Sequence, residues 1–364
     1  MDPRVNEHAR TLVDWGARVE AGDHVVIDMG PEAHDLAVAL AEILGERGAT
    51  YHTTYSSGEI DRAYLTSISD TIPEPSHERA LFKAADVVLQ IGGGRNRSAM
   101  VDVPSDREQA GRLATKTVRE ARYDTRWMST VHPTRSLAQA AAMSFEGYRD
   151  FAYGAMLRDW QALADEMARL KDFLDSGDIV RIVSEGTDIQ LSIANRTAVN
   201  SAASVAYDSH NLPSGEVFTA PEGADGIVTF DIPMVIRGQP VRNVRLTFDD
   251  GEVTALDADE GASVIKSLVD TDAGSRRLGE LGIGMNREIT RYTNHILFDE
   301  KMGGTVHLAL GRAYDACLPD GESGNDSAVH VDLLCDMTDE SRIEIDGETI
   351  QRNGIFSWEP NFPG

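Results

Sequence analysis

The chain has 364 residues, which is enough for two domains with cores of their own, because domains usually run to roughly 100–200 residues. The hydrophobic share of 41% and the charged share of 26% are those of a globular protein, and no stretch approaches the about 18 consecutive apolar residues of a membrane span. The formal net charge of −26, from 60 acidic and 34 basic residues, opposes binding to nucleic acid or to an anionic membrane.

The first half of the chain alternates helix and strand signals. Asp2 followed by Pro3 predicts a helix start, because an acidic side chain can cap the helix and proline suits its first position. Further along we expect a strand at 24–28, a helix over 31–49 that stops near Gly48, a strand at 50–55, and a helix then a strand within 78–94. This alternation predicts a parallel sheet covered by helices.

Two further segments of this half need separate interpretation. The glycines of GGGR, residues 92–95, invite a phosphate-binding interpretation, but they lack the spacing of the known nucleotide loops, so a plain loop at a strand end is favoured. Apolar residues then recur at helical spacing from Tyr153 to Leu174. They predict one helix with a buried stripe that joins the two halves of the chain.

From about residue 178 the pattern changes to strands with hairpin signals. Turns are predicted at Glu185-Gly186, Asp250-Gly251 and Asp346-Gly347, each between two strand-like runs. The predicted fold is therefore an N-terminal parallel-sheet α/β domain with its connecting helix, residues 1–175, followed by a β-rich α+β domain, residues 176–364.

Composition adds expectations about the surroundings of the protein. The first ten residues lack the apolar segment of a secretion signal, so we expect a cytoplasmic protein. Lysine is scarce and carboxylates are spread along the whole chain, which favours solubility at high salt; an ordinary acidic cytosolic protein is the alternative. Cys317 and Cys335 form neither a CxxC metal motif nor a disulfide framework.

Residues that bind metals gather late in the chain. In VHVDL, residues 329–333, a strand places His330 and Asp332 on one face, because side chains alternate with period two. His307 stands in another strand-like run, and Tyr314 follows it beyond Gly311. Each residue alone also has a structural explanation, such as a core histidine or a packed aromatic ring.

Three carboxylates upstream, Glu216, Glu280 and Glu300, stand among apolar or glycine residues rather than in charged runs. An isolated carboxylate in such surroundings is costly to bury unless it is paired or binds a metal. A mixed set of histidine and carboxylate ligands suits zinc, cobalt or manganese. The sequence thus predicts a metal site in the second half.

Four motifs together resemble the aminopeptidase T family of metal-dependent exopeptidases: NLPSGEVFTAP, LGELGIGMN, LFDEKMGGTVHLALGRAY and HVDL. Weaker similarity extends over nearly the full length, and the acidic composition indicates a member of haloarchaeal type. The resemblance implies two divalent metal ions, peptide substrates and a homodimer. It also implies that the metal site is formed by Glu216, Glu280, Glu300, His307, Tyr314, His330 and Asp332.

The resemblance further implies a reaction in which two metals activate a water for peptide hydrolysis. Glu280 is expected to bridge the metals, and Tyr314 to ligate a metal or stabilise the developing oxyanion. Which carboxylate carries the proton of the water to the leaving amine stays open.

Two other functions are weighed against this one. His307, His330 and Asp332 alone make the two-histidine, one-carboxylate set that holds iron(II) in ring-cleaving dioxygenases on a similar scaffold. The three glutamates favour two metals and therefore a hydrolase. A non-catalytic relative that binds peptides or a partner subunit is the third interpretation, and the complete set of predicted ligands argues against it.

Overall fold

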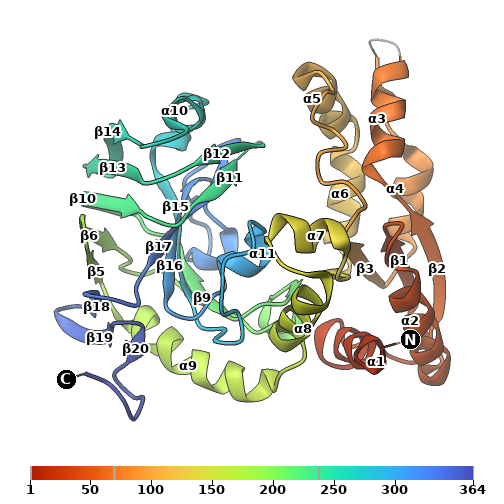
Figure 1. The fold of residues 1–364 in the computed structure, drawn as a ribbon, viewed down its shortest axis with the longest axis horizontal. Coiled ribbons are helices and arrows are strands. Elements are labelled where there is room, and N and C mark those ends of the chain that lie inside the picture. The colour runs from red at the N-terminus through yellow and green to blue at the C-terminus, as the bar shows by residue number, and fades with distance from the viewer. Residues whose placement is uncertain (1, 69–70, 237, 364) are drawn as a thin grey trace. The chain divides into compact units, whose positions relative to one another are not determined.

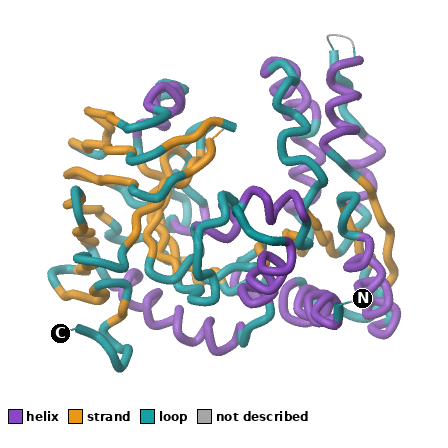
Figure 2. Tube along the Cα trace, viewed as in Figure 1, coloured by secondary structure: helices purple, strands orange, loops and turns teal. Residues whose placement is uncertain are grey.

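The computed structural model describes residues 2–68, 71–236 and 238–363. Its contacts divide the chain into two compact units, one of residues up to Arg158 with Ala203–Pro213, the other of Asp159–Ala202 with Ser214 onwards. Helices are prominent in the first unit, and strands make up much of the second (Figure 2). The predicted fold class, a parallel-sheet α/β part and a β-rich part, is confirmed.

The first unit is built on a parallel sheet with the strand order β2-β1-β3-β4-β8 (Figure 1). Its strands are β1 (His24–Met29), β2 (Thr50–Tyr55), β3 (Val87–Gly92), β4 (Arg126–Val131) and β8 (Asn211–Leu212). All four neighbouring pairs run parallel, as the alternation of helix and strand predicts. Val25, Val26 and Ile27 of the inner strand β1 are buried, so the sheet contributes to the core of this unit.

The helices of the first unit are α1 (Pro3–Arg10) with a π-helical continuation (Thr11–Gly16), α2 (His34–Arg47), α3 (Gly58–Ser67), α4 (Ser76–Lys83), α5 (Ser105–Ala114), α6 (Lys116–Tyr123), α7 (Arg135–Ala140) and α8 (Phe145–Met156). Two helix boundaries of the first unit, the start of α1 and the end of α2, agree with the sequence signals. Asp2 caps α1, since its Oδ1 accepts a hydrogen bond from Arg4 N at 3.0 Å. Gly48 ends α2 in the left-handed conformation, with φ at 78°.

The single helix predicted from Tyr153 to Leu174 is wrong, because the chain forms two helices there. The first is α8, and the second is α9 (Trp160–Ser176). Asp159 starts α9, since its Oδ1 accepts a hydrogen bond from Ala162 N at 2.9 Å. The contacts assign α9 to the second unit and divide the chain after Arg158, whereas the domain boundary expected between residues 175 and 176 stays a prediction.

The larger sheet of the second unit is antiparallel, with the strand order β14-β13-β10-β6-β5-β18-β19-β20. Its strands are β5 (Ile179–Ser184), β6 (Thr187–Ser192), β10 (Gly223–Phe230), β13 (Val244–Asp249), β14 (Glu252–Asp257), β18 (Arg342–Ile345), β19 (Glu348–Arg352) and β20 (Ile355–Phe356). The three predicted turns connect β5 to β6, β13 to β14 and β18 to β19. Asp250 and Gly251 both have positive φ, at 51° and 76°, as a two-residue hairpin turn requires.

Smaller elements complete the second unit. They are the hairpin of β11 (Met234–Ile236) and β12 (Gln239–Val241), the helices α10 (Ala262–Val269) and α11 (Ile296–Asp299), and the 3-10 turns Gly274–Arg276 and Asp315–Cys317; a further 3-10 turn, Val205–Tyr207, lies in the first unit. Within the described residues, no helix combines the length and apolar character needed to span a membrane.

The remaining sheet carries five of the seven predicted metal ligands, namely Glu216, Glu280, His307, His330 and Asp332. Its strand order is β17-β16-β15-β9-β7, and every neighbouring pair is antiparallel. The strands are β7 (Val199–Ser201), β9 (Glu216–Thr219), β15 (Leu278–Gly284), β16 (Thr305–Gly311) and β17 (His330–Asp336). Every residue of β15 and β16 is buried, so these two strands form the rigid centre on which the site is built.

Candidate metal centre

Five of the predicted ligands stand on four adjacent strands of this sheet. Glu216 begins β9, Glu280 lies in β15, His307 in β16, and His330 and Asp332 in β17. The register places Glu280 opposite Ala309, and Ala309 opposite Asp332. Two acidic residues therefore flank the small residue Ala309 in one row across three strands.

Glycines in β15 create the room that His307 occupies. Gly282 pairs with His307, and a Cβ atom on Gly282 would lie only 2.1 Å from His307 Nε2. The imidazole ring thus lies over the backbone of the neighbouring strand. This approach explains the glycine at position 282, because any larger residue there would displace the ring.

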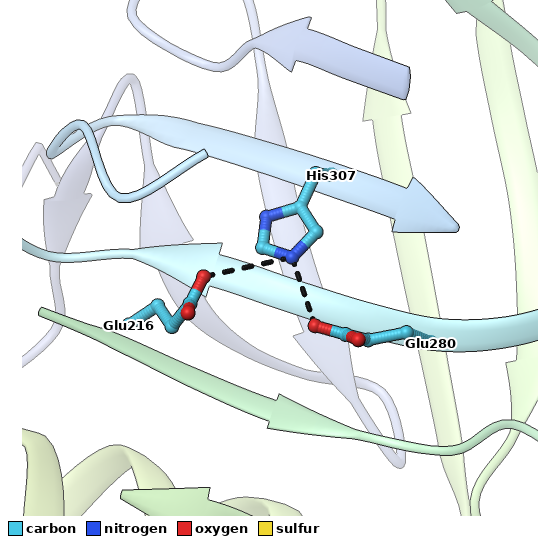
Figure 3. A group of neighbouring side chains, drawn as sticks. All are labelled: Glu216, Glu280 and His307. Carbon is cyan, nitrogen blue, oxygen red and sulfur yellow. Dashed lines mark hydrogen bonds and ion pairs between the residues drawn. The ribbon is translucent and has the colours of Figure 1, made fainter. Parts of the chain in front are cut away.

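The first group of ligand atoms comes from Glu216, Glu280 and His307 (Figure 3). His307 Nε2 lies 3.0 Å from Glu280 Oε1 and 3.6 Å from Glu216 Oε2. Glu216 Oε2 is buried and accepts no hydrogen bond. Two donor atoms at about 2.1 Å from a tetrahedral zinc ion lie roughly 3.4 Å apart, so the spacing of this group fits a divalent ion.

The second group comes from Glu280, His330 and Asp332. His330 Nε2 lies 3.4 Å from Glu280 Oε2 and 3.5 Å from Asp332 Oδ1. His330 Nδ1 lies 2.9 Å from the carbonyl oxygen of Arg312, to which it can only donate, so Nε2 is the nitrogen left to bind an ion. Glu280 belongs to both groups and directs one carboxylate oxygen at each histidine.

The electrostatics of the two groups follow from burial among carboxylates. Burial raises the pKa values of Glu216 and Glu280, because the charged forms lose their water. Burial alone would lower the pKa of His307, but its hydrogen bond to Glu280 and the charge of Glu216 raise that pKa to about 10. The contact with Asp332 likewise outweighs burial and raises the pKa of His330 to about 9. Protons on the two histidines offset the negative charge of the surrounding carboxylates, and bound divalent ions would offset the same charge.

A family model described as thermophilic metalloprotease (M29) matches residues 1–356. The chain belongs to the M29 family of metalloproteases. The predicted resemblance to the aminopeptidase T type and the prediction of a metal-dependent hydrolase are confirmed. The alternative of an iron(II) ring-cleaving dioxygenase has no support in the comparisons.

Individual M29 relatives are similar over different lengths. Aminopeptidase 2 from Geobacillus stearothermophilus is 32% identical over 55% of this chain, and the match spans 54% of that relative. Aminopeptidase T from Thermus aquaticus is 28% identical over 94% of both chains. The solved structure titled wild-type AmpT from Thermus thermophilus has 24% sequence identity and a TM-score of 0.85, and the superposition covers 98% of this chain and 99% of that one. The fold of this M29 chain is therefore that of AmpT.

Lys301 is a charged residue of the centre that the sequence analysis does not single out. Its side chain is fully buried, contacts Glu300 and lies with Nζ 3.4 Å from Glu216 Oε1. Burial alone would lower the pKa of Lys301, yet the charges of Glu216 and Glu300 raise it above its usual value. The ammonium group holds one oxygen of Glu216 and leaves the other directed at His307. The sequence offers only a weak signal for the role of Lys301, namely that one of the few lysines in the chain directly follows the predicted ligand Glu300.

Glu300 lies outside the two groups of histidine and carboxylate ligand atoms, and the ring of Tyr314 lies next to His330. Glu300 follows α11 and contacts Lys301, and burial raises its pKa. The Tyr314 ring lies 4.9 Å from the His330 ring and 5.7 Å from that of Phe218, measured between centroids. The surrounding protein and the charge of Glu280 raise the pKa of Tyr314, so its phenol stays protonated and can donate a hydrogen bond.

Proposed function

We propose that this M29 chain releases N-terminal amino acids from peptides with two divalent ions. Glu216, Glu280 and His307 would hold one ion, and Glu280, His330 and Asp332 the other, with Glu280 shared. The observation that carries the proposal is that two groups of ligand atoms meet at this one carboxylate. The names of similar proteins, which include Aminopeptidase 2 and Aminopeptidase T, support the class of substrate.

Bound ions would supply an acidified water as nucleophile and a Lewis acid for the scissile carbonyl. The residues of the chain have separate tasks around them. Glu280 would hold both ions and so fix the position of the water, and Tyr314 would donate a hydrogen bond to the oxygen that becomes negative. Glu300 and Lys301 complete the site, since Lys301 orients Glu216 and balances part of the negative charge.

The ligand set also supports a choice of metals. Imidazole nitrogens and carboxylate oxygens without thiolates suit zinc, cobalt or manganese. We further propose a cytoplasmic homodimer that acts at high salt and binds neither nucleic acid nor membranes. The net charge of −26 supports activity at high salt and the absence of binding to nucleic acid or membranes. The family resemblance supports the dimer.

Glu280→Gln tests the shared ligand, because glutamine keeps the shape but loses the charge. We expect this variant to lose one ion per chain or most of its turnover. The exposed residue Glu288, in the same unit, provides the control Glu288→Gln. This control should keep its bound ions and its turnover. The readouts are metal per chain by mass spectrometry and release of the N-terminal residue from a dipeptide. Two retained ions with full turnover in Glu280→Gln would refute the role of Glu280.

His330→Ala and Asp332→Ala test the second group separately. Each should bind fewer ions and still give the circular dichroism spectrum of the wild type, because both side chains are partly exposed and stand on an outer strand. Full metal occupancy in both variants would remove this group from the proposal.

A further inference from the structure

The strand β17 forms an outer edge of the metal-binding sheet. Among the described strands it pairs only with β16 (Figure 1). The side chains of His330 and Asp332 share one face of this strand, because they are two residues apart. An outer strand has backbone N–H and C=O groups that no neighbouring strand uses. These groups therefore stand directly beside the candidate metal centre.

The register shows which residues of β17 direct their backbone groups outward. Arg312 N donates to Val329 O at 2.7 Å, and Met337 N donates to Gly304 O at 2.9 Å. These two bonds lie at the two ends of the β16–β17 pairing and continue its register. Because antiparallel pairs alternate, the odd-numbered residues of β17 bond to β16 and the even-numbered residues face away. Asp336 N confirms the direction, since it donates to the side chain of Asp231 at 2.9 Å.

A pocket opens along this outward edge. It has a volume of about 400 Å³, and His330, Asp332 and Leu334, the even-numbered residues, are part of its lining. Its lining also includes Met234 and Ile236 of β11. Further apolar side chains that line the pocket are Ile232, Val235, Leu268, Ile296, Val329 and Val331.

We propose that the pocket binds the part of the peptide that follows the N-terminal residue, as an extended strand added to the edge of β17. The outward N–H and C=O groups of His330, Asp332 and Leu334 would pair with every second residue of the peptide. The apolar wall would accept side chains such as leucine or phenylalanine. Such an edge recognises a main chain with several amide groups. The leaving part of the substrate has such a main chain, whereas the single N-terminal residue does not. This inference rests on the proposed function.

N-methylation of the substrate tests the pairing with the wild-type protein. Four tetrapeptides with N-terminal leucine are compared: the parent and the versions N-methylated at residue 2, 3 or 4. The version methylated at residue 2 alters the scissile bond and serves as a control for loss of cleavage. Only every second peptide N–H can pair with β17, so methylation should matter at just one of residues 3 and 4. At that residue it should lower kcat/KM by about three- to tenfold, because one hydrogen bond is lost, and at the other it should have little effect. Equal effects at both positions, or none at either, would overturn the proposal.

A pair of variants tests the pocket wall. Ile296 lines the pocket and is 45% exposed, whereas Ile179 of β5 is 39% exposed in the same unit and lies outside the pocket lining. Ile296→Asp should lower the ratio of kcat/KM for the tetrapeptide to that for leucinamide by about tenfold, because a carboxylate opposes burial of an apolar side chain. Ile179→Asp should leave this ratio unchanged. An unchanged ratio in Ile296→Asp would contradict the assignment.

The experiments separate this inference from the proposed function. If no peptide is cleaved with zinc, cobalt or manganese, the proposed function fails. If peptides are cleaved and kcat/KM depends neither on peptide length nor on the position of the N-methyl group, the proposed function stands and the edge-pairing inference fails.

Discussion

Gly282 and His307 are paired across β15 and β16, and the imidazole ring of His307 occupies the space that a side chain at position 282 would fill. The absence of a side chain on one strand is thus what lets the other strand present a ligand. This relationship connects a sequence feature, the repeated glycines of β15, with the geometry of the centre.

Gly282→Ala should displace His307 and weaken metal binding by roughly ten- to a hundredfold, as the loss of ligand orientation does in other metal sites. Gly45→Ala is the matched control, since a Cβ atom there meets nothing within 4 Å and the residue lies in α2. Isothermal titration with zinc or cobalt measures the affinity of both variants. The same affinity in Gly282→Ala and in the wild type would show that the ring does not need this space.

Lys301→Met should lower the free energy of unfolding of the metal-free protein by about 3 kcal/mol, because it leaves buried carboxylates without their cation. The control is Lys266→Met, whose side chain is 70% exposed and pairs with Asp270 one helical turn away, so its loss should cost less than about 1 kcal/mol. Urea denaturation with a chelator present gives both values. If the two variants lose the same stability, Lys301 is not a structural counter-ion of the site.

Thermal stability should rise with salt concentration. The carboxylate surplus repels itself, and the screening length falls from ~10 Å at 0.1 M to ~3 Å at 1 M salt. Most of the ion pairs lie near the surface and contribute little, so their weakening by salt should not reverse the trend. Melting temperatures in a potassium chloride series are compared with those in a sucrose series of equal osmolality. A melting temperature that falls or stays level with potassium chloride would exclude this explanation.

Acid should destabilise the first unit through His8. The side chain is fully buried, its Nε2 lies 2.9 Å from Thr130 Oγ1, and burial lowers its pKa from 6.5 to about 3. Between these values the unfolded chain binds a proton that the folded chain does not, so stability is complete above pH 6.5 and falls as the pH decreases. The contribution of His8 to this loss should reach about 2 kcal/mol at pH 5.

His8→Gln isolates this contribution, because glutamine can donate to Thr130 without titrating. The free energy of unfolding of the variant should depend less on pH than that of the wild type between pH 7 and pH 5. His24→Gln, at an exposed histidine in the same unit, is the control and should follow the wild type. Parallel curves for His8→Gln and the wild type would show that His8 does not titrate in this way.

Features that depend on local periodicity could be predicted from the sequence alone. His330 and Asp332 share a face because side chains in any strand alternate, and Asp250-Gly251 forms a hairpin turn because both residues accept positive φ. The helix over 153–174 shows the limit of this reasoning. Its apolar spacing continues across the junction, so periodicity could not reveal that Asp159 starts a new helix.

The arrangement of the centre was decided only by the tertiary structure. Glu280 reaches both His307 and His330 because β15 lies beside β16, and β16 beside β17, an order that no local pattern specifies. Lys301 follows Glu300 in a stretch that reads as polar loop, yet packing encloses it completely against Glu216, which is distant in sequence. Ligand types follow from composition and spacing, whereas their burial, their charge partners and the sharing of one carboxylate depend on which strands become neighbours.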